Sequence, residues 1–168
     1  MMKWDELHAL RNAWRLAGPD WNRRIQAAKL LGEERALEAI PDLEAVALEN
    51  KQPDLAKAAI RALGQICDET AFVAVARVVK GSPDEILATQ CLDVLLLGMK
   101  NGSRTAVQAL IEQCDRFFPV LLNRVMQSDE VARQGILQMG EQGIHKLMDA
   151  LLVPETREVA GSMLRELG

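Results

Sequence analysis

Aromatic residues, histidine and cysteine are all scarce in this sequence. It has no tyrosine, three tryptophans, three phenylalanines and two histidines in 168 residues. Cys67, Cys91 and Cys114 are odd in number and follow no secretion signal, which argues against a disulfide framework. His8 and His145 are too few to complete a metal site with them. We therefore predict buried, unreactive cysteines and a protein that holds no cofactor or metal.

Motifs of common enzyme chemistry are also missing. The sequence has no Walker-type loop, no dinucleotide fingerprint and no Gly-x-Ser-x-Gly turn. No apolar run approaches the ~20 residues of a membrane span, and the amino terminus does not resemble a signal peptide. The net charge is −4 and no basic stripe is concentrated anywhere. These absences favour a non-enzymatic cytoplasmic protein with no membrane partner, and they make nucleic-acid binding unlikely.

What the sequence does contain is a recurring apolar segment that ends in Leu-Gly or Met-Gly. The five copies end at Gly32, Gly64, Gly98, Gly140 and Gly168, so the intervals are 32, 34, 42 and 28 residues. Recurrence at 20 to 50 residues is typical of repeat architectures. We expect each glycine to end a helix in the left-handed conformation.

The copy that ends at Gly64 shows the expected unit. Asp54 is placed to cap a helix whose few polar residues form one narrow stripe, so most of that helix must be covered. A second helix is expected from about Glu69 to Lys80. Its apolar run, Ala71 to Val79, is long and does not alternate, which favours a helix over a strand. Such a pair of helices buries its apolar surface only by stacking on its neighbours.

The pattern resembles the HEAT-like repeats, in particular the short bacterial type of phycobilisome-lyase-like proteins. The acid-to-base spacing of their first helix is matched by Asp20 with Arg24 and by Asp129 with Arg133. The early proline of their second helix is matched at Ile40-Pro41 and Phe118-Pro119. The resemblance covers the chain from about Gly18 onward. It implies an all-α fold, a right-handed α-α superhelix (solenoid) of about five helical hairpins, forming a single domain over residues 1–168.

In this family the second helices line a concave surface, and this implies a scaffold that binds another protein. The polar residues expected to select that partner are Asp42, Arg77, Lys80, Arg124 and Lys146. A subunit of a bilin (tetrapyrrole) lyase or isomerase is the alternative that the resemblance implies. Nucleic-acid binding is a weaker alternative.

Residues 1–18 are expected to form an amino-terminal capping helix. All three tryptophans, Trp4, Trp14 and Trp21, lie within the first 21 residues. They could cover the open end of the stack, as a terminal cap must. The alternative is that they anchor a partner, because tryptophan dominates binding hot spots.

Two further regions depart from the pattern. The interval from Gly98 to Gly140 is about ten residues too long, and we expect one helix from Ser103 to Cys114 and another from Phe117 to Met126. One of them is extra or displaced, and such an irregularity is a reasonable place for function. A last helix is expected to start at Pro154. Its apolar residues would be partly uncovered, which would allow a homo-oligomer through this helix; they are Val159, Met163, Leu164 and Leu167.

Overall fold

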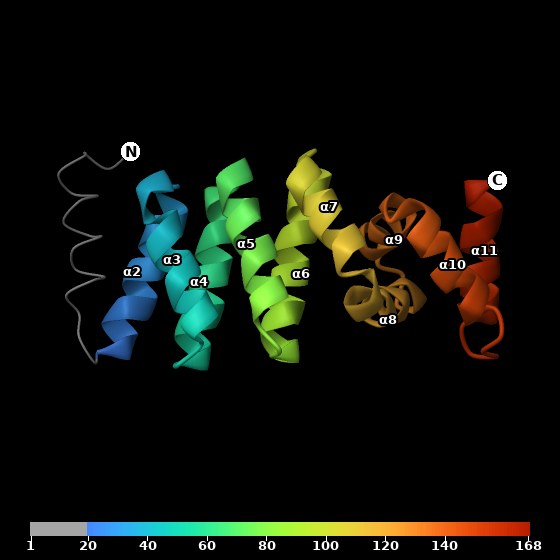
Figure 1. The fold of residues 1–168 in the computed structure, drawn as a ribbon, viewed down its shortest axis with the longest axis horizontal. Helices are drawn as coiled ribbons and strands as arrows, with labels where there is room; N and C mark the ends of the chain where they lie inside the picture. The colour runs from blue at the N-terminus through green and yellow to red at the C-terminus, as the bar shows by residue number, and fades with distance from the viewer. Residues whose placement is uncertain (1–19) are drawn as a thin grey trace. The chain divides into compact units, whose positions relative to one another are not determined.

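The structure, a computed structural model, describes residues 20–168. All of the regular secondary structure among these residues is helical. Ten α-helices and one short 3-10 helix follow one another, and no strand occurs among these residues (Figure 1). The predicted all-α fold of consecutive helical hairpins is confirmed. The expected capping helix over residues 1–18 lies outside the described residues. The contacts divide the chain into two compact units, and the boundary in the sequence falls between Gly98 and Met99.

The first unit consists of regular hairpins. Its elements are α2 (Trp21–Glu33), the 3-10 helix η1 (Leu37–Ala39), α3 (Ile40–Glu49), α4 (Pro53–Ile66), α5 (Glu69–Gly81) and α6 (Glu85–Lys100), whose last two residues group with the second unit. The first helix α2 packs on the next first helix α4, while the second helix α3 packs on both α4 and α5. The apolar run from Ala71 to Val79 is helical, as predicted, and six of its side chains are buried.

Gly32 and Gly64 are packing positions, and the prediction that the repeated glycines end helices is wrong in the first unit. Gly32, Gly64 and Gly98 lie inside α2, α4 and α6. A Cβ added to Gly32 would lie 2.8 Å from the Cα of Ala62, and one added to Gly64 would lie 2.9 Å from the Cγ2 of Val94. Glycine is needed at these positions because a larger residue would force neighbouring helices apart.

The left-handed turn instead comes three residues after the glycine, at Arg35 (φ 52°) and Cys67 (φ 54°). The prediction holds at Gly140, which has a φ of 57° just after α9, and at Gly168. The motif therefore marks the end of each first helix to within three residues, although the glycine and the reversal of the chain are different residues in the first unit.

Five of the ten described α-helices begin with a side-chain cap. Asp20, Asp68, Asp84, Ser103 and Asp129 each accept a backbone N–H from the first turn that follows. The predicted cap at Asp54 is wrong, because α4 already begins at Pro53 and Asp54 forms an ion pair with Lys57 at 3.6 Å. Proline fits that first position well, since it has no N–H to leave unpaired.

The two family prolines also differ. Pro41 lies in the first turn of α3, as predicted. Pro119 does not begin a helix, because α8 starts at Cys114 and continues through it. Because Pro119 has no backbone N–H, it cannot donate the helical hydrogen bond to the carbonyl of Asp115. It is the one proline in the interior of a described helix.

Asn50 links the end of one hairpin to the start of the next hairpin but one. It ends α3 in the left-handed conformation (φ 42°), and its side-chain Nδ2 donates to Oδ2 of Asp84 at 3.0 Å. Asp84 also caps α6, where it accepts the backbone N–H groups of Ile86 and Leu87. The hydrogen bonds from Leu87 and Asn50 lower the pKa of Asp84, and those from Thr70 lower the pKa of Asp68.

The second unit is less regular. Its helices are α7 (Arg104–Glu112), α8 (Cys114–Met126), α9 (Glu130–Gln138), α10 (Gly140–Ala150) and α11 (Arg157–Leu167). The two helices expected between Gly98 and Gly140 are α7 and α8, and α8 begins three residues earlier than predicted. Among the contacts of this unit, α8 packs on α9, and α10 packs on α8, α9 and α11.

The last helix differs from the expectation in two respects. It begins at Arg157 and not at Pro154, because residues 151–156 form turns in which Thr156 Oγ1 donates to the carbonyl of Ala150 at 2.7 Å. Met163, expected to be partly uncovered, is fully buried because α11 packs on α10. Leu167 remains 40% exposed. Between residues 20 and 168, every helix is too short or too polar to span a bilayer.

Candidate functional site

The exposed sides of α3 and α5 form a surface that we name the α3–α5 ridge; its residues are Asp42, Glu44, Ala45, Leu48, Glu49, Val73, Arg77 and Lys80. Because α3 packs on α5, side chains from successive hairpins meet on it. Arg77 Nη1 lies 3.5 Å from Oε1 of Glu44, a largely buried carboxylate, and this pair joins the two helices. Leu48, on α3, is 44% exposed.

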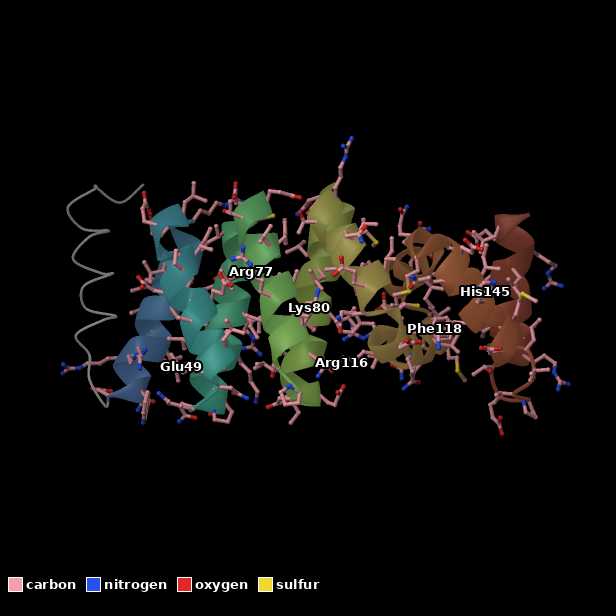
Figure 2. All side chains as sticks on the ribbon, viewed as in Figure 1. Glu49, Arg77, Lys80, Arg116, Phe118 and His145 are labelled. Atoms are coloured by element: carbon pink, nitrogen blue, oxygen red, sulfur yellow. The ribbon has the colours of Figure 1, made fainter. Side chains whose placement is uncertain are left out.

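Three of the predicted site residues lie on this ridge. Asp42 is half-buried in the first turn of α3. Arg77 and Lys80 are exposed on α5 (Figure 2). Their expected role in selecting a partner stays a prediction. Apolar and charged groups alternate on the ridge, as they do in many protein interfaces.

Trp21 lies at the start of α2 and is 39% exposed. The guanidinium carbon of Arg24 lies 5.4 Å from the centre of its ring, within the range of a cation–π contact. Both side chains line a hollow of about 140 Å³ beside the ion pair of Glu49 and Lys51 (3.2 Å). Trp4 and Trp14 lie outside the described residues, so the choice between cap and binding site stays open for the tryptophans.

Arg124 and Lys146, the other two predicted site residues, belong to the second unit. Arg124 is half-buried in the last turn of α8. Lys146 on α10 lies 2.6 Å from Oδ1 of Asp115 on α8. The hydrogen bond and charge of Asp115 raise the pKa of Lys146. Lys146 therefore joins two helices of its own unit.

The second unit also contains a groove that the sequence analysis did not find. Two hollows of about 480 and 400 Å³ share Met99 and Gln138 and lie along α7 and α9. We name the combined surface the α7–α9 groove; its residues are Met99, Lys100, Gly102, Ser103, Arg104, Val107, Gln108, Glu130, Val131, Gln134 and Gln138. Its size is that of sites which take up several side chains or a small molecule.

Two signals in the sequence point to this groove in hindsight. It lies within the long interval between Gly98 and Gly140, where the irregular repeat spacing makes function reasonable to expect. In addition, α7 has a serine cap and no acidic residue in its first turn, whereas each other described α-helix has an acidic cap or an acidic residue there. The second signal requires the helix boundaries, which the sequence left uncertain by several residues.

No group of three or more His, Cys, Asp or Glu side chains within residues 20–168 could hold a metal ion. Cys91 and Cys114 are buried, as predicted, and Cys67 is half-buried at the end of α4. Burial and the charge of Asp115 raise the pKa of the Cys114 thiol, which disfavours the reactive thiolate.

Consecutive helical hairpins, each buried by its neighbours, define an α-helical repeat protein. Residues 11–96 match the family model described as HEAT repeats; this is half of the chain, and the chain therefore belongs to that family. The match ends two residues before the end of the first unit. Comparison with curated proteins and with solved structures gives no match. HEAT repeats generally act as protein-interaction scaffolds.

Proposed function

We propose that this chain is a non-enzymatic scaffold that binds a protein partner along the α3–α5 ridge. The observation that carries the proposal is the ion pair between Arg77 and Glu44, which connects two hairpins across an otherwise exposed surface. Leu48, also on the α3–α5 ridge, is 44% exposed. An apolar anchor on a surface whose charges are already ordered loses little conformational entropy on binding, and a few such anchors carry most of the affinity of an interface.

The test compares two arginines that undergo the same change. Arg77→Glu places two acids together on the ridge and should reduce capture of the partner from a native lysate about ten-fold, the effect of losing one hot spot. Arg61→Glu is the matched control, because Arg61 is also exposed and also contacts a neighbouring helix, through Gln90 at 3.4 Å. It lies on α4, outside the ridge, and should leave capture unchanged. Equal loss in both variants, or in neither, would count against the ridge.

The finer resemblance to phycobilisome-lyase-like repeats, and the bilin chemistry it implies, remain predictions. The positions that support the resemblance are the caps at Asp20 and Asp129 and the first-turn proline at Pro41. Adding a bilin to the purified protein distinguishes the two functions. A shifted visible absorbance spectrum would favour a lyase or isomerase subunit, and an unchanged spectrum is the result that a scaffold predicts.

A further inference from the structure

We propose that the α7–α9 groove binds an acidic, amphipathic segment of a protein partner. This inference rests on the proposed scaffold function, but it uses a different surface, in the second unit. It names the chemistry of the occupant: apolar side chains in the groove and carboxylates beside its two basic residues.

The apolar part of the groove is formed by Met99, Val107 and Val131. All three side chains are half-buried, so each still presents apolar surface for a ligand to cover. They come from the end of α6, from α7 and from α9, and two adjoining hollows run along them. Methionine adapts its shape to different side chains, which suits a surface that takes up a peptide. The amphipathic part of the proposed occupant fits this floor.

Two basic residues line the groove, one in each hollow, against a single carboxylate. Lys100 and Arg104 are exposed on either side of the turn between α6 and α7, and neither forms an ion pair with a described residue. The one carboxylate of the groove, Glu130, accepts a hydrogen bond from Nε2 of Gln134 at 3.1 Å. Two free cations beside an apolar floor call for carboxylates on the occupant, because a cation that a ligand desolvates without pairing is costly.

The position of Arg104 strengthens this argument. A positive charge in the first turn of a helix is unfavourable, because the helix N-terminus itself carries partial positive charge. No acidic residue offsets it in α7, where Ser103 is the cap. An unfavourable charge that nothing in the folded chain compensates is expected where the charged residue serves binding. The carboxylate of a partner would supply the missing negative charge.

A peptide fits the groove better than a nucleic acid does. Two cations neutralise few phosphates, and the whole chain has a net charge of −4. The amide groups of Gln108, Gln134 and Gln138 along the groove can both donate and accept hydrogen bonds, which matches the backbone of a peptide.

The experiment measures fluorescence anisotropy of a labelled peptide of about 14 residues titrated with the full chain. The peptide carries leucines at helical spacing and glutamates between them, and a matched peptide has lysine in place of every glutamate. The acidic peptide should bind with a micromolar Kd, and the basic one should bind at least about ten-fold more weakly. Equal affinities, or no binding of the acidic peptide at millimolar protein, would overturn the proposal.

Arg104→Glu is the decisive variant. It should weaken binding of the acidic peptide about five-fold or more. It should also raise the midpoint of thermal unfolding, because it places an acid in the first turn of α7. Lower affinity in a more stable protein cannot be explained by damage to the fold. Unchanged affinity, or a lower unfolding midpoint, would contradict the proposed role of Arg104.

Two further measurements separate this inference from other occupants and from the scaffold function. Tighter binding of a duplex DNA oligonucleotide than of the acidic peptide would overturn it, as would a self-association in sedimentation that Arg104→Glu abolishes. Arg77→Glu, the ridge variant, should bind the acidic peptide normally. If Arg104→Glu kept both peptide binding and partner capture, the groove proposal would fail while the ridge proposal would stand.

Discussion

The two units of this chain bury their helices in different ways. In the first unit, helices of successive hairpins approach closely at glycine and alanine, as Gly32 does at Ala62. In the second unit, helices α7 and α9 leave a groove whose two hollows measure about 480 and 400 Å³. Regular repetition brings matching surfaces together and covers them, whereas an irregular helix leaves part of its neighbours open. The family match over residues 11–96 falls on the regular unit, and the groove falls on the other.

The largest effect that separates the units is expected at their glycines. Gly32→Val should lower the free energy of unfolding by about 3 kcal/mol, because the new side chain meets the backbone of Ala62, which cannot rotate away. Gly161→Ala in α11 should instead raise it by about 0.5–1 kcal/mol, since its Cβ would make an ordinary 3.6 Å contact with Leu151 and helices favour alanine. Urea unfolding measures both free-energy changes. Equal changes for Gly32→Val and Gly161→Ala would contradict the difference in packing between the two units.

Replacement of Pro119 should give the next largest change in the free energy of unfolding, an increase where Gly32→Val gives a decrease. Pro119→Ala should raise the free energy of unfolding by about 1–3 kcal/mol, because alanine restores the N–H that the carbonyl of Asp115 lacks. Pro41→Ala is the matched control in the first unit. Pro41 lies in the first turn of α3, where the missing N–H costs nothing, so the change should stay within about 0.5 kcal/mol. Destabilisation by Pro119→Ala would show that the proline is held by contacts that outweigh the lost hydrogen bond.

The smallest predicted difference is in pH dependence. The pKa of Asp84 is lowered in the folded first unit, so its contribution to stability is present above the unfolded value of about 3.9 and is lost as pH falls through the folded pKa. The pKa of Lys146 is raised in the second unit, so its contribution is present below about 10.4 and is lost as pH rises through the folded pKa.

Acid should therefore loosen the first unit before the second, and alkali the second before the first. Hydrogen exchange followed by mass spectrometry resolves peptides from the two units and measures this order. Asp84→Asn should reduce the acid effect without changing the alkaline one, and Lys146→Met should do the reverse. An identical order of loosening at both extremes would contradict the assignment.

The sequence predicted the existence and order of the helices because each depends on local periodicity and on caps such as Asp20 and Asp129. It assigned the wrong role to Gly32 and Gly64, since a glycine near a helix end fits both a left-handed cap and a close approach between helices. Only the distance to Ala62 or Val94 separates these roles, and that distance depends on a helix some thirty residues away.

The candidate surfaces were predictable to different degrees. Arg77 and Lys80 could be placed on the ridge, because the repeat fixes which helix carries them. The groove could not be predicted, since it arises where α7, α9 and the end of α6 fail to repeat the earlier packing. Arg104 is an ordinary surface residue in the sequence, and its significance appears only once the first turn of α7 is located.

The hydrogen bond from Asn50 to Asp84 has a consequence for how the first unit comes apart. Asn50 is the residue that ends α3, and its side chain donates a hydrogen bond to Asp84, which caps α6. Melting of α3 alone would therefore weaken the start of a helix in a later hairpin. This hydrogen bond favours the unfolding of several hairpins together over the unfolding of one hairpin at a time. The first unit should therefore unfold as a single cooperative segment under force or heat.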